Sequence, residues 1–170
     1  MKFFRSLLIA VALAASPPLV QAQEQVIGAD PAPAAPTNVW ATSCGSGTRA
    51  GAASCQLSQR AVSSQTRRLL AALTLQFPAS GEARMLVTTP LGVSLPTGIS
   101  FDIDGAGKQS LPFDACDRNG CYASAPISAE LLSAMQAGQK LNISLQNTQK
   151  QVATIPLSLA GFTAAYNSVK

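Results

Sequence analysis

The 170-residue sequence contains no histidine at all. This absence excludes Ser-His-Asp and Cys-His catalysis, removes the commonest general base, and leaves no histidine to bind a metal ion. Only carboxylates remain as candidate acid–base groups. We therefore expect a protein that is not an enzyme, with no catalytic residue, no bound metal and no cofactor.

Charge is also sparse, since charged residues make up 12% of the chain. The formal net charge of +4 includes Lys2 and Arg5, which lie in a segment that we expect to be removed, so the mature chain carries 4 − 2 = +2. Its only adjacent cations, Arg67 and Arg68, are typical of a solvated turn or strand end. So small a charge gives no electrostatic footprint for nucleic acid, and we expect no nucleic-acid partner.

The N-terminal apolar stretch, Leu7–Ala15, is too short to span a bilayer. Basic residues precede it and the small-residue site Val20–Ala22 follows it, which is the pattern of a cleavable Sec-type signal peptide over residues 1–22. No twin-arginine pair is present, and no cysteine follows the cleavage site to carry a lipid. We expect cleavage after Ala22 and a periplasmic or secreted protein with no transmembrane segment in the mature chain.

Residues 23–38 are rich in proline and alanine, which favour extended polyproline II and offer few large apolar groups to bury. We expect a flexible leader here. The remaining residues, 39–170, have the length of one domain that can bury a substantial core.

Four cysteines form an even set in a chain that we expect to be exported, so two disulfides are the default interpretation. Three connectivities are compatible with the sequence. Loop-closure entropy favours bridges between near neighbours, which predicts Cys44–Cys55 and Cys116–Cys121. A redox role usually needs Cys-x-x-Cys, which is absent, and only Cys116 and Cys121 approach the ligand spacing of a structural zinc site.

The dominant apolar period along the domain is two, the period of half-buried strands. Alternating runs occur at Leu69–Phe77, Leu141–Leu145 and Ala153–Leu159, and Pro156 in the last run indicates an edge strand because proline cannot donate to a ladder. Turn signals recur between the runs, at residues 78–81, 96–98, 104–107, 119–120 and 147–148. The pattern predicts a mainly β fold, an antiparallel β-sandwich or flattened barrel with one or two short helices.

Only one helix has clear boundary signals. Ser128 can cap it, Gly138 can end it, and Leu131 and Met135 share its apolar stripe, giving about ten residues. A short helical turn is expected over 161–167. The single tryptophan, Trp40, is expected in the core or against a disulfide, with a ligand-stacking role as the alternative.

Asp102 and Asp104 form the one acidic pattern that resembles a cation site, because Asp-x-Asp-Gly can begin a calcium loop. The third acidic ligand and the distal glutamate of such a loop are missing. We interpret the pair as a solvated strand end and turn. A weak cation site, or a metal-dependent enzyme that uses Asp102 and Asp104, is the least favoured alternative.

Five blocks follow one another along the domain in an order that resembles the invasion-associated locus B family of exported proteobacterial proteins. The blocks are Trp40 with Cys44 and Cys55, PLGVSLP at 90–96, FDID at 101–104, LPF at 111–113 with Cys116, Gly120 and Cys121, and LAGFTAA at 159–165. The resemblance covers residues 39–167. It implies a periplasmic or secreted, non-enzymatic β-domain, and some pathogen members of the family are associated with entry into host cells.

Our leading hypothesis is a binding or envelope-interaction module that presents loops on a disulfide-pinned scaffold, because recognition usually sits on loops held by a rigid sheet. The alternative is an accessory protein, an inhibitor or a chaperone-like protein, that binds another exported protein. In either case the partner, an unknown protein or envelope component, and the oligomeric state stay open. The candidate binding residues lie in two loops and are Leu91, Val93, Leu95, Asp114, Asp117, Arg118 and Tyr122.

Overall fold

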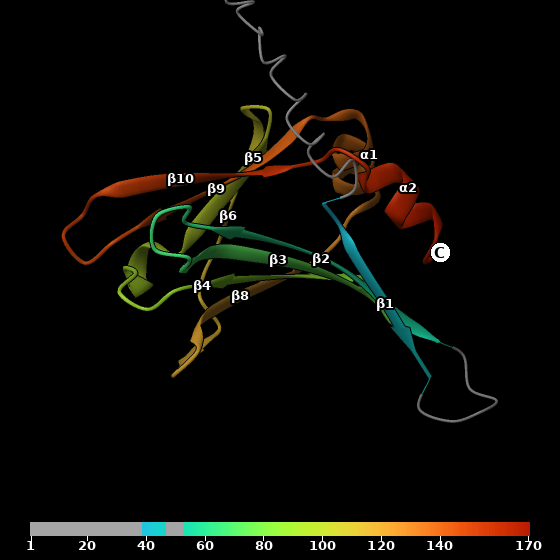
Figure 1. Ribbon diagram of the computed structural model, residues 1–170, viewed down its shortest axis with the longest axis horizontal. Helices are drawn as coiled ribbons and strands as arrows, with labels where there is room; N and C mark the ends of the chain where they lie inside the picture. The colour runs from blue at the N-terminus through green and yellow to red at the C-terminus, as the bar shows by residue number, and fades with distance from the viewer. Residues whose placement is uncertain (1–38, 47–52) are drawn as a thin grey trace, which may run out of the picture. The chain divides into compact units, whose positions relative to one another are not determined.

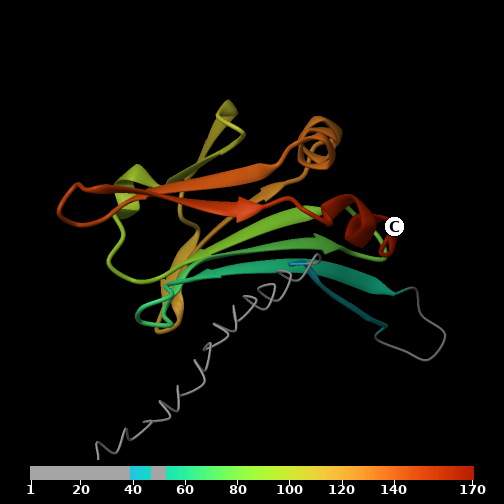
Figure 2. The same cartoon turned by 45° about the horizontal axis from the view of Figure 1, so that its top comes forward.

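Two antiparallel β-sheets form the domain (Figure 1). The structure, a computed structural model, describes residues 39–46 and 53–170. The expected signal peptide and leader, residues 1–38, lie outside the described residues. The two sheets lie one above the other as the layers of a sandwich (Figure 2), so the mainly β prediction is confirmed in its sandwich form.

The larger sheet has six strands in the order β1-β2-β3-β4-β8-β7. Their alternation of buried and exposed residues follows the period of two in the sequence: on β3, for example, Ala71, Leu73 and Leu75 are fully buried. The bounds are β1 Ala41–Gly45, β2 Ser54–Val62, β3 Leu69–Phe77, β4 Arg84–Thr89, β7 Ala115–Asp117 and β8 Gly120–Pro126.

The smaller sheet has four strands in the order β10-β9-β5-β6. Pro156 lies on the edge strand β10, as its missing N–H predicts. The bounds are β5 Ile99–Ile103, β6 Ala106–Leu111, β9 Lys140–Gln146 and β10 Val152–Ser158. On β2, Gln59 is buried and its amide donates a hydrogen bond to the Ser158 carbonyl (2.9 Å), which ties the two sheets together.

Two helices and one 3₁₀ turn complete the fold: α1 Ala129–Ala137, α2 Phe162–Asn167 and η1 Leu95–Thr97. The Ser128 hydroxyl accepts a hydrogen bond from the Leu131 N–H (3.2 Å), and Gly138 follows the last helical residue, so both predicted ends of α1 are confirmed. Gly138 does not adopt the left-handed conformation; an added Cβ there would collide with Ile103. Close packing against the β5–β6 hairpin therefore favours glycine.

Trp40 is a core residue, as predicted. It is 4% exposed, and its ring centroid lies 5.1 Å from that of Phe162 on α2. Phe162 in turn stacks on Tyr166, with ring centroids 6.0 Å apart. The two ends of the described chain thus close the core against each other, through a contact between residues that are far apart in sequence.

Both predicted disulfides are present. Cys44–Cys55 joins directly opposed residues of β1 and β2, and Cys116–Cys121 joins opposed residues of β7 and β8. Each bridge pins an outermost strand of the six-stranded sheet to its only neighbour there. The chain-entropy model assigns about 2–3 kcal/mol of stabilisation to bridges that close loops this short.

Candidate functional site

The first candidate loop follows β4 and crosses from one sheet to the other. Val93 is only 7% exposed and forms a β-bridge with Asn147, and the Ser94 N–H donates to the Gln146 carbonyl (2.7 Å). Val93 is therefore an anchor of the loop and is not available as a contact residue. Leu91 and Leu95, on either side of this anchor, are 57% and 54% exposed.

The turn between β9 and β10 lies against this loop. The Asn147 side-chain oxygen accepts hydrogen bonds from the Gln149 and Gln151 N–H groups (both 2.9 Å), and the Thr148 N–H donates to the Gly92 carbonyl (3.2 Å). Lys150 has a φ of 64° in this turn, and Val152 after it is 68% exposed. The sequence identified the turn but gave no reason to connect it with Leu91 or Leu95.

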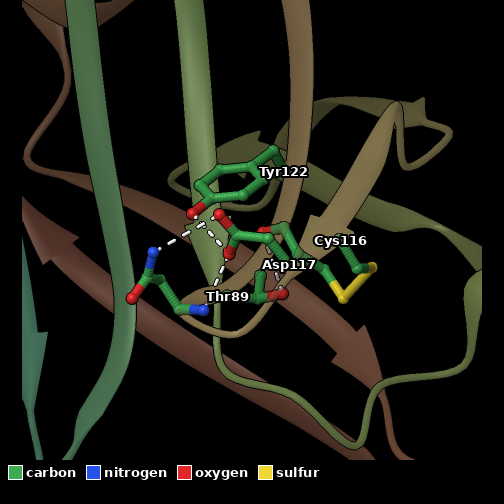
Figure 3. Close-up of a disulfide and its surroundings, with 6 residues drawn as sticks. Thr89, Cys116, Asp117 and Tyr122 are labelled. Carbon is green, nitrogen blue, oxygen red and sulfur yellow. Dashed lines mark hydrogen bonds between the residues drawn. A yellow bond between two sulfur atoms is a disulfide. The ribbon is translucent and has the colours of Figure 1, made fainter.

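The second candidate loop is the β7–β8 hairpin (Figure 3). The Asp117 carboxylate accepts hydrogen bonds from the Asn119 N–H (2.7 Å), the Asn119 amide (3.3 Å) and the Tyr122 hydroxyl (3.0 Å). Arg118 and Asn119 form the turn, so the hairpin is shifted by one residue from the predicted Asn119–Gly120 turn, and Gly120 begins β8. The Cys116–Cys121 bridge closes the hairpin behind this network.

This hydrogen-bond network shifts the pKa values of the Asp117 carboxyl and the Tyr122 hydroxyl in opposite directions. The hydrogen bond from the Asn119 N–H, with those from Tyr122 and the Asn119 side chain, lowers the pKa of Asp117. The same contact raises the pKa of Tyr122, because its hydroxyl donates to a carboxylate. At neutral pH the hairpin therefore holds an ionised aspartate and a neutral tyrosine. This stabilises the loop and leaves the pair poorly suited to proton transfer.

The other charged residues of the hairpin differ in how they are engaged. The Ser124 hydroxyl donates to the Asp114 carboxylate (2.6 Å), and the Asp114 N–H donates to the Tyr122 carbonyl (2.8 Å). Arg118 is exposed, and its guanidinium makes no hydrogen bond or ion pair with any other described residue. In this hairpin the carboxylates of Asp114 and Asp117 accept hydrogen bonds from neighbouring groups, whereas the Arg118 guanidinium is exposed to solvent.

A third loop, between β2 and β3, reaches the same place. The Ser63 N–H donates to the Arg68 carbonyl and the Arg67 N–H to the Ser63 carbonyl, both at 2.9 Å. Arg67 and Arg68 are exposed immediately before β3, which confirms the predicted solvated strand end. Sequence analysis missed them as site residues because nothing local connects them with Leu91 or Arg118.

These loops meet at one end of the sandwich. Strand register brings the end of β2, the start of β3, the end of β4 and the start of β8 side by side, and an open hollow of about 580 Å³ is lined by residues from all three connections. Its lining includes Arg68, Leu70, Leu91, Arg118 and Asn119. We call the surface formed by residues 62–70, 90–97, 117–119 and 147–152 the loop end; it lies at the left in Figures 1 and 2.

Asp102 and Asp104 lie at the opposite end and serve the fold. Asp104 and Gly105 form the two-residue turn between β5 and β6 with φ of 51° and 85°, the combination that a type I′ turn needs. The Asp104 carboxylate accepts hydrogen bonds from the Gln139 and Lys140 N–H groups (2.8 and 2.9 Å), and Asp102 accepts from Gly105 and Asn142. Within residues 39–46 and 53–170, no group of three or more acidic or cysteine residues is placed to hold a metal ion.

Comparisons with known proteins identify one family and a solved structure of similar fold. A family model described as Invasion associated locus B (IalB) protein matches residues 40–170. A crystal structure of invasion associated protein B from Bartonella henselae is similar in fold, with a TM-score of 0.68 and 20% sequence identity over 77% of this chain and 90% of that chain. No curated protein sequence matches significantly. Among the helices that the structure describes, none combines the length and the apolar character needed to cross a membrane.

Proposed function

The chain belongs to the Invasion associated locus B (IalB) protein family, and from this premise we propose that it is an exported, non-enzymatic binding module that contacts a component of the bacterial envelope through its loop end. Two disulfides support export, because such bridges persist in oxidising compartments. The predicted signal peptide supports the same route. A periplasmic or secreted location follows from the proposal.

The observation that carries the proposal is the convergence of the two candidate loops. Leu91 and Arg118 lie far apart in sequence and in separate loops, yet both line one hollow. Hydrogen bonds and the Cys116–Cys121 bridge hold these loops in place. A preformed loop surface loses little conformational entropy on binding, which is the arrangement that recognition favours.

The non-enzymatic part of the proposal rests on how the carboxylates are used. Asp102, Asp104, Asp114 and Asp117 all accept structural hydrogen bonds. The sequence has no histidine to replace them as a general base. The family and the Bartonella protein are both described as invasion associated, and an invasion-associated role is the specific form that we propose for a secreted protein of this kind.

A second candidate function has its own observation. Strand β6 is an edge strand, and an apolar groove of about 470 Å³ runs between it and α1, lined by Phe101, Ile103, Leu131 and Ala134 among others. An extended segment of another exported protein can add to such an edge and place apolar side chains in the groove. This is the accessory-protein alternative, an inhibitor or a chaperone-like protein.

A capture experiment separates the two candidates. The mature, disulfide-bonded chain is immobilised and exposed to a periplasmic and membrane extract, together with three variants. The double substitution Leu91→Ser and Arg118→Gln changes the loop end, Ala134→Glu places a charge in the apolar groove, and Lys140→Gln is a matched surface control. We expect capture of one major component that the loop-end variant loses and the other two retain; loss with Ala134→Glu alone would favour the accessory protein.

A further inference from the structure

Exposed large apolar side chains are concentrated at the loop end. Of the six in the described part of the chain, five lie there and only Val39 lies elsewhere. They lie in or beside three connections, β2–β3, β4–β5 and β9–β10, and are 38–68% exposed: Val62, Leu70, Leu91, Leu95 and Val152. Five of the six exposed large aliphatic side chains at one end of the domain mark that end as a candidate interaction surface.

Cations surround these apolar residues. Arg67, Arg68, Arg118 and Lys150 are all exposed at the loop end, and their side chains make no hydrogen bond or ion pair within the described residues. The nearest acids, Asp114 and Asp117, are occupied by Ser124, Asn119 and Tyr122.

The remaining described acids lie at the far end of the sandwich, in the β3–β4 turn, at the β5–β6 turn and at the start of α1. These four are Glu82, Asp102, Asp104 and Glu130. The loop end carries four cations and one occupied carboxylate, Asp117, which gives 4 − 1 = +3, whereas the rest of the described chain carries five cations and five acids, which gives 5 − 5 = 0. Such a surface attracts anions although the protein as a whole is nearly neutral.

We infer that the loop end docks on the anionic surface of a phospholipid bilayer. The aliphatic side chains enter the boundary between headgroups and acyl chains, while the arginines and Lys150 contact lipid phosphates. Arginine suits this role because its planar guanidinium binds phosphate in a bidentate manner. The inference rests on the proposed function and names the envelope component that the loop end contacts.

The distribution of the apolar residues favours a bilayer over a protein partner. Leu91 and Leu95 lie on either side of Val93 in the β4–β5 connection and Val152 begins β10; of the three, only Leu91 lines the hollow. A fluid interface accommodates several separate apolar side chains at once, whereas a folded partner needs complementary pockets. Protein interfaces are also centred on buried aromatic residues together with arginine, and none of the residues that line the hollow is aromatic.

Vesicle co-sedimentation of the mature, disulfide-bonded chain tests the inference. Vesicles of phosphatidylglycerol and phosphatidylcholine in equal parts are compared with vesicles of phosphatidylcholine alone, at low and high salt. We expect binding to the anionic vesicles that salt weakens. Since each cation near an anionic surface contributes about fivefold to the binding constant, Arg68→Gln, Arg118→Gln and Lys150→Gln together lower it by about two orders of magnitude.

Apolar variants and matched controls complete the design. Leu91→Ser and Leu95→Ser each lower the binding constant by about tenfold, because the exposed leucines no longer enter the bilayer. Lys140→Gln removes a cation at the far end and Val39→Ser an exposed valine outside the loop end, and both bind as the unchanged chain does. Equal melting temperatures show that all variants fold.

Two results overturn the inference. The first is vesicle binding of the wrong kind. The chain would bind vesicles with and without phosphatidylglycerol equally well, or Lys140→Gln would weaken binding as much as the loop-end substitutions do. The second is capture of a protein by the loop end with no affinity for either kind of vesicle; this result removes the bilayer as partner and leaves the proposed binding function standing. If the unchanged chain neither captures an envelope component nor binds either kind of vesicle, the bilayer inference and the proposed binding function are both contradicted.

Discussion

Gly120 lies directly against the main-chain carbonyl oxygen of Thr89 on the neighbouring strand β4. A Cβ at position 120 would collide with that oxygen, and the φ of Gly120 is 151°, a conformation that other residues resist. Thr89 is itself fully buried, and its hydroxyl donates to the Cys121 carbonyl (3.4 Å). The contact fixes the β7–β8 hairpin on the sheet and so sets the position of Arg118 at the loop end.

Replacing Gly120 by alanine or valine is therefore expected to destabilise the domain. The backbone must leave its favoured conformation or the two strands must separate, at a cost of about 1–3 kcal/mol. Denaturant unfolding measures the loss. Gly45→Ala is the matched control, since no described atom lies within 4 Å of a Cβ there, and its midpoint is expected to stay unchanged. An unchanged midpoint for Gly120→Val, with selective loss of partner capture, would show that the hairpin is a recognition site whose glycine is not needed for folding.

Asp104 is expected to contribute to stability and not to metal binding. Asp104→Ala removes the acceptor of the Gln139 and Lys140 N–H groups and places alanine at a φ of 51°, which together cost about 1–3 kcal/mol. Asp104→Asn keeps one acceptor oxygen and a residue that tolerates this conformation, so its loss is smaller. Thermal unfolding with and without calcium or zinc tests both points. A rise of several degrees with either ion, absent in Asp104→Ala, would establish a metal site.

The coupling of Asp117 to Tyr122 can be measured by titration. Asp117→Asn removes the charge that the hydroxyl donates to, so the raised pKa of Tyr122 is expected to fall towards its ordinary value of about 10. The chain has two tyrosines, and the Tyr166→Phe background leaves Tyr122 as the only one. Absorbance of the tyrosinate ion gives the pKa directly. No change on substitution would contradict the hydrogen bond.

The same pair sets a pH window for the hairpin. Folding lowers the pKa of Asp117. Its contribution to the stability of the folded state is therefore present above the unfolded pKa of about 3.9 and is lost as pH falls through the lower folded pKa. The raised pKa of Tyr122 acts in the opposite direction. Its contribution to the stability of the folded state is present at lower pH and is lost as pH rises through the folded pKa, which lies above about 10.

The mature N-terminus is expected at Gln23. Intact-mass measurement on protein from a periplasmic fraction should show the loss of residues 1–22, because Val20–Ala22 matches the small-residue pattern of a signal-peptidase site. Full-length protein retained in the membrane fraction would mean that the segment acts as an anchor.

Local signals made much of the fold predictable from the sequence. Ser128 and Gly138 set the ends of α1, Pro156 placed β10 at an edge, and two close cysteine pairs gave both disulfides. Each of these features depends on residues near one another in the chain. Periodicity and capping are local properties, so they were sufficient here.

The loop end was not predictable in the same way. Leu91 and Arg118 were identified in separate loops, but Arg68, Lys150 and Val152 were not, because strand order and register bring them together. Val93 was predicted as a contact residue although its bridge to Asn147 buries it. Both outcomes have one cause: long-range pairing decides which loop residues meet and which side chains point inward.

Site-specific crosslinking in intact cells tests the central claim most directly. A photoreactive residue is placed at position 91 in the loop end or, as the control, at position 140 at the far end, and crosslinked products are identified by mass spectrometry. The account predicts that position 91 yields a discrete adduct with an envelope component and position 140 yields none. An adduct from position 140 with none from position 91 would contradict the loop end as the binding surface.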